Sequence, residues 1–223
     1  MKTIRWFFYL LAICSYHSLY SQEELGNGMI FPQFEKGIVV FKTGLRSAAS
    51  LNYDMMEQQM LFIDPDSTIL VVANPLQISV VIIGDRRFLP ISERGDFYEE
   101  IQAGEGSFFV QRKAVMISEG KAAAYGGYSQ TQSSTSYGVW HSGMGSVVKL
   151  KVDEKFKLKT ETIYYLQSGK NYKRFFSAKT LGKLFKGHGS EIEKFANEQS
   201  IDFSKTDNVA RIVEYAYSLN PNP

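Results

Sequence analysis

Cysteine is nearly absent from this sequence, since Cys14 is the only one among 223 residues. It lies in an apolar run near the start, and a chain that loses this run has no thiol left. This excludes a disulfide, a thiolate metal site and a cysteine nucleophile in the rest of the chain. We therefore expect a fold held together by its hydrophobic core, which about 200 residues can provide because they bury roughly 70% of their unfolded surface.

The sequence also has no apolar run of the roughly 20 residues that cross a hydrocarbon core. Near the start, Lys2 and Arg5 precede the apolar residues 6–13, and small and polar residues follow. This order is typical of an export signal, so residues 1–21 are predicted to be a signal peptide that is cleaved after Ser21. We expect the mature chain in the periplasm or associated with the outer membrane, without a transmembrane helix.

Two alternatives stay open for this segment. It could form a buried N-terminal helix instead of a signal. Cys14 could also carry a lipid anchor, because "LAIC" is close to the bacterial lipoprotein box, although Ile13 stands where that box has a small residue. We expect Cys14 to be one more hydrophobic residue of the signal core.

The mature chain has no excess of either charge. Loss of Lys2 and Arg5 lowers the basic residues from 25 to 23, which equals the 23 acidic residues. A neutral chain has no overall electrostatic attraction to nucleic acid or to an anionic membrane surface. We therefore predict no nucleic-acid partner.

Residues 37–112 are predicted to form short antiparallel strands. Their apolar runs are rich in Val, Ile, Phe and Leu and are separated by Gly, Pro, Asn or Asp. The sequences on either side of Asp64–Ser67 and of Gly84–Asp85 are expected to pair as hairpins, because these residues suit tight turns. Successive hairpins without an intervening helix predict an antiparallel sheet.

Residues 147–167 return to an alternating pattern, which predicts a half-exposed hairpin. We interpret its lysines as a solvated face and not as a basic binding patch, because acidic residues dilute them. The apolar positions are Leu150, Val152, Phe156 and Leu158, and the lysines are Lys149, Lys151, Lys155, Lys157 and Lys159.

The C-terminal part changes to a helical period. Ser190 and Glu193 predict a capping box, and Asp207 is expected to cap the last helix. Short amphipathic helices are not stable alone, so they must pack on the sheet or on one another. The last helix is predicted to bury a stripe of Val209, Ile212, Val213, Ala216 and Tyr217.

These patterns predict an α+β fold. It consists of a mainly antiparallel β-sheet, as a hairpin meander, a sandwich or a partial barrel, with a C-terminal cluster of short helices. Residues 22–176 are predicted to form the β-rich domain, and residues 177–219 the helical segment that packs on it.

The sequence contains no recognisable catalytic motif. His141 and His188 are far apart and lack the spacing of metal ligands, and the phosphate-loop and nucleophile-elbow motifs are missing. Glu99 and Glu100 are adjacent and would face opposite sides of a strand, so they are not a carboxylate pair. We predict no catalytic residue, no metal and no cofactor, although carboxylates that meet only in the fold leave a hydrolase open.

Residues 124–146 carry no charge and combine aromatic side chains with Gly, Ser, Thr and Gln. Aromatic side chains give a large contact area at low entropic cost, which suits sugar rings or an extended peptide. The alternative is a long loop whose aromatic side chains fold back on the sheet. The candidate ligand-binding residues are Tyr125, Tyr128, Tyr137, Trp140 and His141.

Several stretches together resemble a family of secreted cell-envelope proteins from Bacteroidetes-type bacteria. They are "GIVVFKTGLRSAASLNYD", "FID…ILVVAN…VVIIGDRRFLPI", "AAAYGGYS" and "YYLQSGKNYKRFFSAKTLGKLF…IEKFANEQSIDF". The resemblance implies export to the cell envelope. It implies no activity, cofactor or catalytic residue.

We therefore predict an exported, non-enzymatic cell-envelope protein that binds or scaffolds an envelope protein or glycan. Two alternatives are a hydrolase of an envelope polymer and a structural subunit of an outer-membrane assembly.

Overall fold

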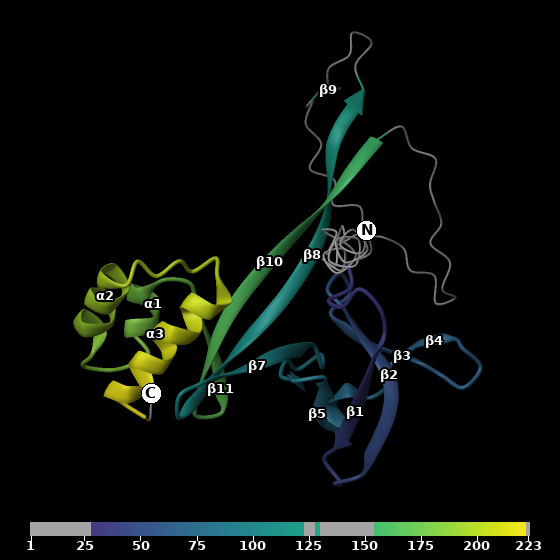
Figure 1. Ribbon diagram of the computed structural model, residues 1–223, viewed down its shortest axis with the longest axis horizontal. Coiled ribbons are helices and arrows are strands. Elements are labelled where there is room, and N and C mark those ends of the chain that lie inside the picture. The colour runs from purple at the N-terminus through teal and green to yellow at the C-terminus, as the bar shows by residue number, and fades with distance from the viewer. Residues whose placement is uncertain (1–27, 123–127, 130–153, 222–223) are drawn as a thin grey trace, which may run out of the picture.

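The computed structural model describes residues 28–122, 128–129 and 154–221. One antiparallel sheet dominates this part of the chain, and three helices follow its last strand (Figure 1). The strand order is β11-β10-β8-β7-β6-β5-β1-β2-β3-β4, and β9 pairs with β8 beside this path. The predicted α+β class, with an antiparallel sheet and C-terminal helices, is confirmed.

The first seven strands form successive antiparallel pairs. Strand β5 lies next to β1, so that β1 pairs with both β2 and β5. Their bounds are β1 (Glu35–Phe41), β2 (Arg46–Asp54), β3 (Gln59–Ile63), β4 (Ile69–Val71), β5 (Ile78–Ile83), β6 (Arg86–Pro90) and β7 (Phe97–Ala103). A short 3-10 helix, η1 (Pro75–Gln77), precedes β5. The remaining strands are β8 (Gly106–Ala122), β9 (Tyr128–Ser129), β10 (Glu154–Ser168) and β11 (Asn171–Phe175).

Both predicted hairpin turns are present. Gly84 has a φ of 60° between β5 and β6, a backbone conformation that glycine adopts without steric cost. Between β3 and β4, the amide of Ser67 donates to the carbonyl oxygen of Asp64 at 3.0 Å, and the amide of Thr68 donates to the Asp64 carboxylate at 2.8 Å. The turn chemistry of these residues therefore sets the register of both hairpins.

Strands β1, β2, β3, β5, β6 and β7 enclose one of the two hydrophobic cores, together with Ala114 of β8. Tyr53 and Phe88 are both buried in it, and their rings stack with centroids 5.8 Å apart. Leu158 of β10 packs against the same core from outside. The base of the long strand pair is thereby held to the first half of the sheet.

The helices form the second core together with the other end of the sheet. They are α1 (Ala178–Gly182), α2 (Gly189–Glu198) and α3 (Thr206–Leu219). Phe108, Tyr164 and Phe175 from three strands pack against them. The predicted stripe of α3 is confirmed, since its buried residues are Val209, Ile212, Val213, Ala216 and Tyr217.

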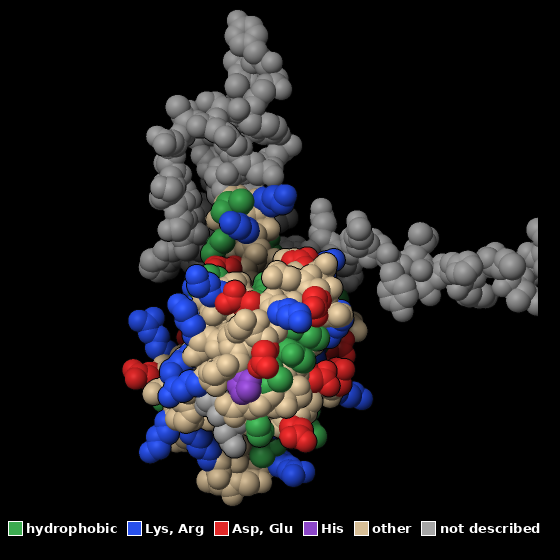
Figure 2. Space-filling model, turned by 90° about the vertical axis from the view of Figure 1, so that its left-hand side faces the viewer, with side chains coloured by type: hydrophobic (Ala, Val, Ile, Leu, Met, Phe, Trp, Pro, Cys, Tyr) green, Lys and Arg blue, Asp and Glu red, His purple; other side chains and the backbone are tan. Residues whose placement is uncertain are grey.

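Helix α3 lies directly on the β7–β8 hairpin. A Cβ atom on Gly106 would lie 2.3 Å from the ring of Tyr217, so the helix approaches closely only because this residue has no side chain. The hydroxyl of Tyr217 donates to the carbonyl oxygen of Ser107 at 3.1 Å. Figure 2 shows basic and acidic side chains interspersed over the helical end of the molecule.

The predicted helix caps are wrong. Helix α2 begins at Gly189, and His188 precedes it without a side-chain cap, so Ser190 and Glu193 already lie inside the helix. A capping box is instead present before α1, where Ser177 and Thr180 exchange hydrogen bonds between side chain and backbone. Helix α3 starts after Lys205, which places Asp207 within its first turn.

Candidate functional site

Strands β8 and β10 extend well beyond the rest of the sheet as a two-stranded ribbon (Figure 1). They pair from Phe109 and Tyr165 near the body to Lys121 and Glu154 at the far end. We call the outer part, residues 113–122 and 154–161, the arm. In sequence, the predicted binding stretch 124–146 connects the two outer ends of the arm.

The predicted ligand-binding residues lie largely outside the described part of the chain. This holds for Tyr125, Tyr137, Trp140 and His141, and equally for the predicted signal of residues 1–21. Tyr128 belongs to β9, where its backbone pairs with Ala122 of β8. Of the five candidates, only Tyr128 therefore lies in the part of the chain that the structure describes.

The arm has two different faces. On one face, Val115 pairs with Lys159, and Ile117 pairs with Lys157. Val115 is 52% exposed and Ile117 is 42% exposed. On the other face, Leu158 packs against the first core, so the predicted separation of Lys157 and Lys159 from Leu158 is confirmed.

We call Val115, Ile117, Lys157 and Lys159 the arm face. Figure 2 shows hydrophobic and basic side chains together on the narrow part of the molecule above the body. A two-stranded ribbon is only marginally stable by itself. Its exposed aliphatic side chains add no stability as long as they stay in contact with water, because the hydrophobic effect requires their burial. The arm face therefore combines exposed aliphatic and basic side chains on a part of the sheet that projects from the body.

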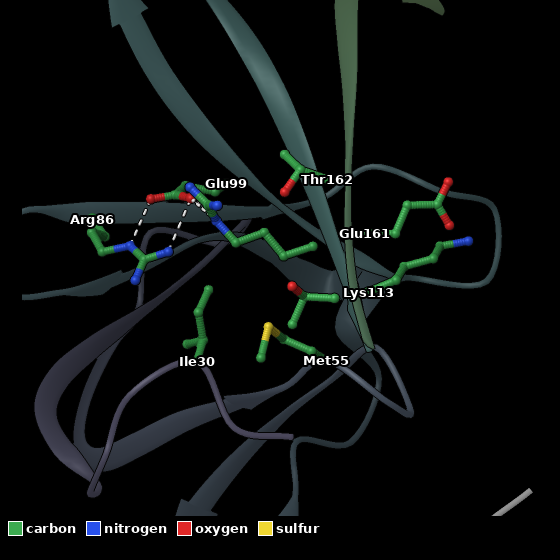
Figure 3. Close-up of a pocket in the computed structure, with 9 residues that line it drawn as sticks. Ile30, Met55, Arg86, Glu99, Lys113, Glu161 and Thr162 are labelled. Atoms are coloured by element: carbon green, nitrogen blue, oxygen red, sulfur yellow. Dashed lines mark hydrogen bonds and ion pairs between the residues drawn. The ribbon is translucent and has the colours of Figure 1, made fainter. Parts of the chain in front are cut away.

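A pocket of about 440 Å³ lies at the base of the arm (Figure 3). Its volume falls within the range of small-molecule sites, about 300–1,000 Å³. Its walls come from the neighbouring strands β6, β7, β8 and β10, from the segment before β1 and from the residue after β2. The lining residues are Ile30, Met55, Arg86, Glu99, Arg112, Lys113, Thr160, Glu161 and Thr162.

Glu99 of β7 holds two arginines in this pocket. Arg86 donates its Nε–H to Oε1 at 2.6 Å and its Nη2–H to Oε2 at 3.0 Å. Arg112 donates its Nε–H to Oε2 at 2.7 Å. The guanidinium of Arg86 also lies 5.0 Å from the centre of the Phe31 ring and 5.3 Å from that of Phe88, which holds its plane in place.

Strand register explains why these three charges meet. Phe88 of β6 pairs with Glu99, and Glu99 pairs with Val110 of β8. Arg86 and Arg112 are each two residues from these partners, so both project on the same face of the sheet as Glu99. Glu100 faces the opposite side, where it accepts from Arg87 at 2.8 Å, which confirms the predicted opposite orientation of the two glutamates.

The arginines keep Glu99 ionised. Burial by itself raises the pKa of Glu99, but the hydrogen bonds and charges of Arg86 and Arg112 outweigh it and leave the pKa below its ordinary value. Glu99 therefore carries no proton to donate near neutral pH. Asp54, the other buried acid in the described part, caps the amides of Met56 and Glu57 and does not line the pocket.

Sequence reasoning missed this cluster. Arg86, Glu99 and Arg112 follow one another at intervals of 13 residues, because the strand partners of Glu99 lie 11 residues away and each arginine lies two residues beyond its partner position. Charges of opposite sign at this spacing on consecutive strands are the signal that could have identified them. The signal is usable only when the hairpin register is known.

Comparison of the chain with protein-family models, curated proteins and solved structures finds no match in any of the three. In the described ranges, no group of three or more His, Cys, Asp or Glu side chains is placed to hold a metal ion. None of the three described helices is long and apolar enough to cross a membrane.

Proposed function

We propose that the chain is an exported cell-envelope protein that acts by binding another protein and not by catalysis. The observation that carries this proposal is the arm face, which exposes two aliphatic and two basic side chains on a projecting ribbon. The signal-like N-terminus and the resemblance to secreted envelope proteins support the location. The partner we propose is an envelope protein with an acidic surface.

The chemistry of the arm face favours a protein over a glycan. Val115 and Ile117 are aliphatic, and burying them stabilises a complex only against another apolar surface. From the sequence, these lysines are expected to form a solvated face. Because Lys157 and Lys159 pair with Ile117 and Val115, we propose instead that they favour acidic groups on the partner. The glycan alternative rests on the aromatic side chains of residues 124–146, which lie outside the described part.

The pocket gives no support to the hydrolase alternative. A glycoside hydrolase needs one carboxyl group that carries a proton and a second one nearby. Glu99 is ionised and uses both oxygens in ion pairs with arginines. The exposed Glu161 at the same pocket contacts Arg174 at 3.8 Å.

Replacing Val115 and Ile117 together by threonine is expected to weaken partner capture at least about tenfold. Val115→Thr replaces a methyl group and Ile117→Thr an ethyl group by a hydroxyl, so three apolar carbons leave the contact, at about 0.8 kcal/mol each when fully buried. Threonine suits a strand, so the free energy of unfolding should change little. Chemical cross-linking in intact producing cells, followed by identification of the cross-linked protein, measures the capture.

Ile69 and Val71 on the edge strand β4 provide the matched control, because both are exposed aliphatic residues far from the arm in sheet order. Their double change to threonine should leave the same cross-link intact. If this control abolishes the cross-link and the arm variant does not, the contact surface is β4. That outcome would overturn the arm proposal and favour the structural-subunit alternative.

A further inference from the structure

We propose that the pocket at the base of the arm binds a small organic carboxylate whose apolar part rests on Ile30 and Met55. This site is separate from the arm face and does not depend on the proposed function. The two arginines of the pocket supply the recognition of the carboxylate group.

Arg86 and Arg112 have N–H donors that Glu99 does not use. Glu99 accepts three N–H donors in total, two from Arg86 and one from Arg112. Among the described residues, no other acceptor meets either guanidinium. Each guanidinium has more donors in a planar fork, and this fork matches a carboxylate in a bidentate pair. Both arginine side chains are 25% exposed, so a ligand can reach these donors.

The lining of the pocket carries a net positive charge. Three basic residues line it against two acidic ones, so the lining carries one positive charge in excess. Glu99 neutralises only one of the two guanidinium groups that it holds together. Two cations fixed side by side attract an anion more strongly than two mobile ones, because the cost of bringing them together is already met by the fold.

Ile30 and Met55 form the apolar part of the pocket lining. Figure 3 shows Ile30 and Met55 across the pocket from the ion pairs of Glu99. Met55 is 4% exposed and forms the floor of the pocket, whereas Ile30 is half-buried, so an inorganic anion would leave Ile30 in contact with water and an organic acid would cover it. Thr160 and Thr162 also line the pocket, and their hydroxyl groups can donate to a carboxylate oxygen.

Benzoate titrated into the full mature chain is the direct probe, with two-dimensional amide NMR as the readout. We expect saturable shifts at Arg86, Arg112 and Thr162. Benzamide, which has the same ring without the charge, should cause none, and inorganic phosphate should compete only weakly. Equal shifts with benzamide, binding of phosphate alone, or no saturable shift with benzoate would each overturn the proposal.

The matching variant is Arg112→Gln, which should weaken benzoate binding at least about tenfold because it removes one charged fork. Arg87→Gln is the control, since Arg87 lies on the opposite face with Glu100 and should leave binding unchanged. If Arg112→Gln does not fold, Lys113→Glu at the pocket rim is tested in its place. This variant should weaken benzoate binding about threefold. Unchanged affinity in the folded variant would overturn the proposal.

Discussion

Replacement of Glu99 by glutamine is expected to lower the free energy of unfolding by about 3 kcal/mol, the lower end of the range for breaking a buried ion pair. Glu99 is nearly buried, and its two oxygens neutralise part of the charge of Arg86 and Arg112. Glutamine keeps the shape but removes the charge, which leaves two guanidinium groups side by side. The lower end applies because both arginines retain contact with water.

Urea unfolding of the mature chain at pH 7 measures this loss. Glu100→Gln is the matched control, because it removes the neighbouring carboxylate from an ion pair with Arg87, whose side chain is 51% exposed. Exposed pairs contribute only about 0–1 kcal/mol, so this variant should remain close to the parent protein. A loss of about 1 kcal/mol or less for Glu99→Gln, equal to that of the control, would show that the pocket ion pairs do not stabilise the fold.

The difference in unfolding free energy between the parent protein and Glu99→Gln should decrease at acidic pH. The pKa of Glu99 in the folded chain lies below its ordinary value of 4.5. The stabilisation is therefore fully present above that value and is lost as the pH falls through the folded pKa. The stability difference between the parent protein and Glu99→Gln should accordingly shrink below pH 4.5.

Replacement of Phe175 by alanine is expected to cost about 3–5 kcal/mol, as for other fully buried phenylalanines. Phe175 ends β11 with no exposed surface, and its ring stacks on Tyr164 at 5.8 Å between centroids. It belongs to the core that α1, α2 and α3 share with the sheet. The cavity would weaken the contact through which the sheet supports the helices.

The adjacent Phe176 supplies the control for this change. Phe176 is 62% exposed, so alanine there should alter the free energy of unfolding by less than about 0.5 kcal/mol. Urea unfolding followed by far-ultraviolet circular dichroism compares the two variants. If Phe176→Ala is as damaging as Phe175→Ala, the helices do not pack on the sheet as described.

The parts of the fold that depend on local chemistry could be predicted from the sequence. The turn at Gly84 needs only a residue that tolerates positive φ, and the buried stripe of α3 needs only a helical period. The cap at Ser190 was wrong because the helix begins at Gly189, two residues earlier than a cap at Ser190 indicates. Element ends are sensitive to such small shifts.

The pocket could not be predicted in the same way. Arg86, Glu99 and Arg112 lie on three strands, and they meet only because the hairpins that join those strands are in the observed register. A shift of one residue in either hairpin would turn one arginine to the other face. The pairing of β8 with β10 is also long-range, since 31 residues separate Ala122 from Glu154.

Export is the claim on which the proposed function most directly depends. Intact-mass spectrometry of the chain recovered from fractionated producing cells tests it. We predict that the chain is found in the envelope fraction with a mass that lacks residues 1–21, so that it begins at Gln22. Recovery of the chain from the cytosol with residues 1–21 still attached would contradict the proposal.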